Sequence, residues 1–176
     1  LRSSTGCLHT RNSFKKGALD SMFEDELASQ EDAAEKIGNL LGWSARDTIE
    51  ILGGPWRAEM NGDIVDSVNP EFFVGRAADS VALLFDLKNR TLTIGKAVGH
   101  WTNVHNLLWN VEEPQQTFGL ESLSTQEASD AVDAAFASKR RSLRICRYCG
   151  ELLGRERMAG DQQCYGCGTR VFGAVY

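Results

Sequence analysis

Cys146-Arg147-Tyr148-Cys149-Gly150 and Cys164-Tyr165-Gly166-Cys167-Gly168 are two C-x2-C-G units in a chain of 176 residues, and they decide how its C-terminal part folds. Each unit can point two thiolates at one ion, because the glycine after the second cysteine permits the tight, positive-φ turn that N–H···S hydrogen bonds require. Fourteen residues separate the inner cysteines, enough for a small hairpin that brings the units together. Four thiolates suit tetrahedral zinc, so the four cysteines of these units are predicted to bind one Zn²⁺.

The segment 143–176 resembles a short zinc ribbon, the family of paired C-x2-C-G knuckles found in transcription and translation factors. The resemblance covers about a fifth of the chain. It implies a bound metal and a ribbon fold, and residues 170–176 are predicted to form the last ribbon strand. It does not imply one function, because zinc ribbons bind DNA, RNA or protein, or simply cap a fold.

Two other roles for the cysteines stay open at this point. Iron in a rubredoxin-like site uses the same four ligands. Two disulfides would require an oxidising compartment, and the sequence contains no secretory signal that would favour one. Because four protein ligands leave no open coordination position, the metal is predicted to be structural, and the segment is expected to unfold without it.

The net charge of −5 is unevenly distributed along the chain. Residues 138–176 carry eight Lys and Arg against three Asp and Glu, a net +5. Residues 1–137 carry eleven Lys and Arg against 21 Asp and Glu, a net −10. An acidic body with a basic tail is typical of a chain that contacts nucleic acid through the tail, although the two parts could also attract each other.

These features favour a binding protein over an enzyme, with DNA or RNA, or the machinery that handles them, as the partner. The cations predicted to contact phosphates are Lys139, Arg140, Arg141, Arg144, Arg147, Arg155 and Arg157. One alternative is a protein-interaction or scaffold protein in which the zinc-binding segment is a structural cap. A second is a metal-dependent nuclease that uses Asp66, Asp86 and Lys88, since Asp86-Leu87-Lys88 matches the short D-x-K pattern of restriction-type nucleases.

The periodicity of apolar residues predicts an α+β fold: a helical N-terminal part, a central β-hairpin or small sheet, a long helix and the zinc ribbon. Helices are expected at 22–42, 45–52, 102–112 and 125–142, a hairpin at 81–95, and short strands at 64–65 and 72–74. Ser124 and Glu127 form the pattern of a capping box. In the helix at 102–112, Trp101, His105 and Trp109 would share one face, which could stack bases or form part of the core.

The predicted organisation is a flexible basic leader at 1–21, an α+β body at 22–120, a connecting helix at 121–142 and the zinc ribbon at 143–176. The residues before Met22 could also be a gene-calling remnant or an organelle transit peptide. The longest apolar run has five residues, at 81–85, whereas a membrane-spanning helix needs about 20. The sequence therefore predicts no membrane span and a cytoplasmic protein.

Overall fold

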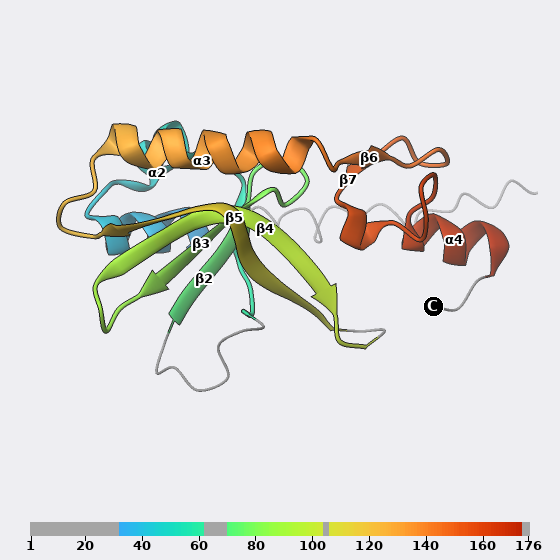
Figure 1. Cartoon of the computed structure of the whole chain (residues 1–176), viewed down its shortest axis with the longest axis horizontal. Coiled ribbons are helices and arrows are strands. Elements are labelled where there is room, and N and C mark those ends of the chain that lie inside the picture. Colours follow the sequence, from blue (N-terminus) through green and yellow to red (C-terminus); the bar gives the residue numbers. More distant parts are fainter. Residues whose placement is uncertain (1–31, 62–69, 104–105, 174–176) are drawn as a thin grey trace, which may run out of the picture.

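A five-stranded antiparallel sheet forms the centre of the molecule (Figure 1). The computed structural model describes residues 32–61, 70–103 and 106–173. The strands pair in chain order: β1 (Trp56–Ala58), β2 (Pro70–Gly75), β3 (Val81–Asp86), β4 (Thr91–Trp101) and β5 (Leu107–Gly119). The predicted α+β class is confirmed, and so are the hairpin, now β3 and β4, and the strand at 72–74. The strand expected at 64–65 lies outside the described residues.

Helices cover one face of this sheet (Figure 1). They are a helix over residues 32–41, α2 (Ala45–Leu52) and α3 (Thr125–Arg140). Their apolar side chains pack on the sheet in one cluster, which includes Ile37, Leu52, Phe73, Phe85 and Val132, all fully buried. A smaller cluster around Phe72, Val74 and Trp109 lies on the other face. Removal of these large side chains from water is the main favourable contribution to the fold.

The long helix α3 begins as its sequence predicts. The Ser124 hydroxyl accepts a hydrogen bond from the Glu127 N–H at 3.2 Å, and the Glu127 carboxylate accepts one from the Ser124 N–H at 3.0 Å. This capping box satisfies two backbone donors that a helix start leaves free.

The helix predicted at 102–112 is wrong. β4 ends at Trp101 and β5 begins at Leu107, and these two residues are paired across the hairpin. The spacing of Leu107, Trp109 and Val111 also matches the alternation of a strand. The local pattern was therefore compatible with a helix and with a strand. Pairing along almost the whole length of β4 decides in favour of the strand, because tertiary pairing overrides a weak local preference.

The cysteine-rich part adds a two-stranded sheet, β6 (Arg144–Ile145) with β7 (Leu152–Leu153), a short 3₁₀ helix, η1 (Arg155–Arg157), and α4 (Tyr165–Phe172). The strand predicted at 170–176 is wrong for its described residues, since the chain is helical through residue 172. The reason is local: Cys164 caps the first turn of α4 by accepting from the Cys167 N–H. Among the described helices, none is both long enough and apolar enough to cross a membrane.

Candidate metal centre

The four cysteine sulfurs meet at one point of the C-terminal segment. The Sγ atoms of Cys146, Cys149, Cys164 and Cys167 all lie within 4.8 Å of one another, and those of Cys149 and Cys164 are 4.0 Å apart. Tetrahedral zinc with Zn–S bonds of 2.3 Å requires sulfurs roughly 3.8 Å apart. A small contraction of the cluster would therefore enclose an ion, and the four residues form a possible metal-binding site.

Each pair of cysteines is held by a different piece of backbone. Cys146 and Cys149 lie in the turn between β6 and β7, where Gly150 has a φ of +75° and donates its N–H to the Cys146 carbonyl at 2.9 Å. Cys164 and Cys167 lie at the start of α4. An isolated bridge between Met158 and Cys164 ties the second pair to the segment before it. The site is thus built from a turn and a helix start.

Backbone N–H groups point at the sulfurs. The Cys164 N–H donates to Cys146 Sγ at 3.4 Å, and the Cys167 N–H donates to Cys164 Sγ at 3.3 Å. Three of the cysteines are buried and Cys149 is exposed. Sulfurs that accept N–H groups in a protected cluster are suited to the thiolate form that a metal ion requires.

The electrostatics of the cluster favour the thiolate of Cys146 and oppose those of Cys149 and Cys167. Hydrogen bonds from the backbone, the Cys149 N–H first among them, lower the pKa of Cys146 to about 6. Burial raises the pKa of Cys167 to about 12, and the pKa of Cys149 is also raised. A bound cation would supply the positive charge that the remaining thiolates lack, so the donor set fits a metal ion.

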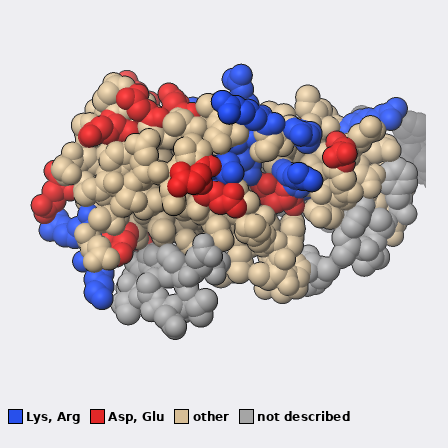
Figure 2. All heavy atoms as spheres, viewed as in Figure 1, with Lys and Arg blue, Asp and Glu red and all other residues tan. Residues whose placement is uncertain are grey.

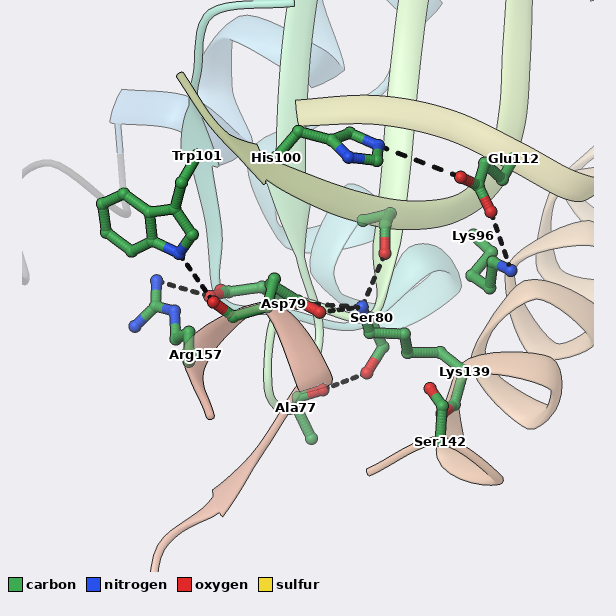
Figure 3. Close-up of polar contacts among 12 residues, drawn as sticks. Ala77, Asp79, Ser80, Lys96, His100, Trp101, Glu112, Lys139, Ser142 and Arg157 are labelled. Carbon is green, nitrogen blue, oxygen red and sulfur yellow. Dashed lines mark hydrogen bonds and ion pairs between the residues drawn. The ribbon is translucent and has the colours of Figure 1, made fainter. Parts of the chain in front are cut away.

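An ion pair joins this segment to the sheet and to α3 (Figure 3). The Lys139 ammonium donates to the Glu156 carboxylate at 2.8 and 3.0 Å and to the Ala97 carbonyl at 2.8 Å. The two side chains are only 2% and 6% exposed. The Glu156 side chain approaches the backbone of β4 closely here: a Cβ on Gly99 would lie 3.1 Å from Glu156 Cγ.

Further contacts surround the ion pair. The Trp101 indole N–H donates to the Glu156 carbonyl at 2.7 Å, and the Trp101 ring meets Tyr165 of α4 edge to face. The Arg157 guanidinium binds the Asp79 carboxylate at 2.8 Å (Figure 3). Asp79 also accepts from Arg57. Together these contacts hold the cysteine-rich segment against β4 and against the turn between β2 and β3.

The structure divides the seven predicted phosphate contacts into two groups. Lys139 is buried in its ion pair and Arg157 is bound to Asp79, so neither presents an unpaired cation at the surface. The other five are exposed, and none of them pairs with a carboxylate among the described residues: Arg140, Arg141, Arg144, Arg147 and Arg155. Figure 2 shows Lys and Arg gathered over the end of α3 and the cysteine-rich segment.

The residues of the nuclease alternative do not form a metal site in the described chain. The Asp86 carboxylate accepts from the backbone N–H groups of Lys88 and Asn89, both at 3.0 Å, and from the Asn89 side chain. Bonds from Asn89 are the main cause that lowers the pKa of Asp86. Asp86 therefore closes the hairpin turn. Asp66 lies outside the described residues.

The helical face predicted for Trp101, His105 and Trp109 is not formed, because the two tryptophans lie on the paired strands β4 and β5 of a hairpin; these two tryptophans nevertheless line one pocket. Trp109 is buried in the smaller core cluster, and Trp101 contacts the cysteine-rich segment. His105 lies outside the described residues. Glu156, the partner of Lys139, was not predicted from the sequence. No local signal could have found it, because 17 residues separate the two in the chain.

Comparison of the chain with protein-family models, curated proteins and solved structures finds no match.

Proposed function

We propose that the protein binds one Zn²⁺ through its four clustered cysteines and contacts nucleic acid through the arginines around them. Zinc is the ion that suits four thiolates and has no redox chemistry of its own. With four protein ligands, no position would be left for a substrate, so the metal acts on the fold. In this proposal, zinc holds residues 143–176 in a shape that presents the cations.

The observation that carries the proposal is the group of five exposed arginines without carboxylate partners among the described residues. Surface cations usually find acids nearby in so acidic a chain, and the other described parts do contain such pairs, for example Arg90 with Glu121 and Lys96 with Glu112. Arg144 donates to the Leu143 carbonyl at 2.9 Å, and Arg147 donates to the Gln162 side chain at 3.4 Å. The positive charge of these two arginines therefore meets only neutral oxygens among the described residues. Such exposed arginines can bind phosphate oxygens, with two N–H groups per phosphate.

The charge of the rest of the chain supports an oriented contact. Residues 1–137 carry 21 acidic against eleven basic residues and would be repelled by phosphates. Only the end of α3 and the cysteine-rich segment would then approach nucleic acid. The proposed division is a body at 22–120, a connecting helix at 121–142 and the zinc-binding segment at 143–176, after a leader at 1–21.

Binding of zinc-loaded protein to labelled DNA and RNA at two salt concentrations tests the proposal. We expect affinity to fall steeply with salt, and the double variant Arg144→Gln/Arg147→Gln to bind about tenfold or more weakly with a salt slope reduced by about 2. Metal analysis should give one zinc per chain for the wild type and less for Cys164→Ser.

The matched control is Arg90→Gln, which removes an exposed cation from the turn between β3 and β4. It should retain wild-type affinity. Absence of binding at low salt, or an equal loss in the control, would contradict the nucleic-acid contact, whereas zinc stoichiometry would still test the metal site by itself.

A further inference from the structure

The segment that carries the exposed arginines also exposes apolar side chains. Ile145 is 64% exposed, Tyr148 49% and Leu152 46%. Large apolar groups gathered on the surface of so small a segment indicate a binding surface. We infer that this surface stacks unpaired bases, so that the ligand is single-stranded nucleic acid; the inference rests on the proposed function and specifies its ligand.

Strand pairing brings two of these residues together. Ile145 on β6 lies directly opposite Leu152 on β7. Residues directly opposite each other in an antiparallel pair have their side chains on the same face, a few ångströms apart. Both are exposed, so the two-stranded sheet presents one apolar face to solvent.

The cysteine cluster holds the turn that joins the two strands of this face. The turn between β6 and β7 contains Cys146 and Cys149, and Tyr148 lies between them in the chain. Cys146 is completely buried, whereas the tyrosine next to its partner is half exposed. We define the base platform as the paired Ile145 and Leu152 together with the exposed Tyr148 of the adjoining turn. Its side chains would keep their arrangement only while the turn is held by the four sulfurs.

Cations flank the platform on the same short stretch of chain. Arg144 precedes Ile145 on β6 and so lies on the other face of the two-stranded sheet, at its edge, and Arg147 precedes Tyr148 in the turn. Both arginines are exposed and donate only to neutral oxygens among the described residues. A nucleotide chain alternates a phosphate with a flat apolar base, and the segment alternates guanidinium groups with apolar or aromatic side chains. This correspondence of charge and apolar surface is what selects nucleic acid as the occupant over an apolar protein segment, which would leave the arginines unpaired.

The exposed apolar groups distinguish single strands from duplexes. In a duplex the faces of the bases are covered by their neighbours, so arginines alone could bind it and the platform would stay in water. In a single strand the faces are accessible, and stacking on an aromatic ring adds affinity that does not depend on base sequence. The preference should therefore depend on the ring of Tyr148.

The experiment compares a labelled single-stranded 20-mer with the duplex of the same sequence, as DNA and as RNA, at one salt concentration and with zinc-loaded protein. We expect the single strand to bind more tightly. Tyr148→Ala should lose about tenfold on the single strand, with little change on the duplex, while Tyr148→Phe, which keeps the ring, should bind like wild type. The salt slope of Tyr148→Ala should stay unchanged, because no phosphate contact is removed.

The controls separate this inference from the proposed function. Leu87→Ser removes an exposed apolar side chain from the body and should change nothing. Zinc content, measured for each variant, establishes that the segment is folded. Equal or tighter binding of the duplex, with Tyr148→Ala unaffected, would overturn the single-strand inference and leave the proposed function standing. No binding of any nucleic acid would overturn both. Self-association of the protein that Ile145→Ser abolishes would also overturn the inference, because a protein would then cover the platform.

Discussion

At the scale of single residues, the buried Lys139 ammonium places strict requirements on its surroundings, because a buried charge needs polar partners. A charge that is 2% exposed loses its hydration, and only the Glu156 carboxylate and the Ala97 carbonyl replace it. Desolvation of two ions is costly, so such a pair adds little net stability. Removal of one partner is costly because it strands the other charge in the interior.

We therefore expect Lys139→Met to lower the free energy of unfolding by about 3–5 kcal/mol, measured by urea denaturation of zinc-loaded protein. The methionine fills similar volume but leaves the Glu156 carboxylate without its cation. The double variant Lys139→Met/Glu156→Gln removes both charges and should be more stable than Lys139→Met alone. Strictly additive effects of the two substitutions would contradict the direct pairing of these charges.

At the scale of the secondary-structure element, α3 shows how a local pattern can define a helix end. The Ser124 hydroxyl and N–H both donate to the Glu127 carboxylate, at 2.6 and 3.0 Å. These bonds, the hydroxyl first, lower the pKa of Glu127 below its ordinary value of 4.5. They need no partner from the rest of the fold, which explains why the sequence alone predicted them.

Ser124→Ala should lower the free energy of unfolding by about 1 kcal/mol near pH 7, because the first turn of α3 loses its cap. Since the pKa of Glu127 is lowered in the folded state, its contribution is complete above pH 4.5 and is lost as pH falls through the folded-state pKa. The difference between wild type and variant should shrink over that acid range, as followed by denaturation at several pH values.

Ser129→Ala, in the interior of the same helix, is the matched control for the cap. It makes the same chemical change where the structure gives the serine no capping role, and alanine is the better helix former there. It should not destabilise the protein. A destabilisation equal to that of Ser124→Ala would argue against the capping box as the cause.

At the scale of the whole molecule, the cysteine-rich segment and the sheet depend on each other. Glu156 and Arg157 belong to η1, and their partners lie on α3 and on the turn between β2 and β3. The loop that positions η1 is bounded by the two cysteine pairs. Loss of the proposed metal would therefore move Glu156 away from Lys139 and leave a buried charge in the body.

Chelation of the metal should unfold residues 143–173 and also lower the melting temperature of the body. The proposed structural zinc would supply roughly 10–16 kcal/mol of apparent binding free energy, more than the stability that so small a segment could keep without it. Limited trypsin digestion followed by mass spectrometry should reveal new cleavage after Arg144, Arg147 and Arg155, while differential scanning calorimetry reports on the body.

The double variant Lys139→Met/Glu156→Gln provides the control for this communication. Without the buried pair, chelation should still open the segment to trypsin but should no longer shift the melting temperature of the body. If chelation left the melting temperature of the body unchanged in the wild-type protein, the ion pair would not couple metal loss to the stability of the body.

The features that the sequence by itself determined are those set by neighbours in the chain. The two cysteine pairs, each taken alone, the cap at Ser124 and the hairpin at 81–95 depend on groups within a few residues. Turn and cap geometry brings these groups together whatever the rest of the molecule does, so spacing alone predicts them.

Only the tertiary structure decided the features that join distant parts of the chain. It made 107–112 a strand, because β4 offered a partner along its length. It buried Lys139 against Glu156 and bound Arg157 to Asp79, which removed two of seven predicted phosphate contacts from the exposed unpaired group. It left Ile145, Tyr148 and Leu152 in solvent. Burial and pairing depend on which surfaces meet in space, and residue spacing carries no information about that.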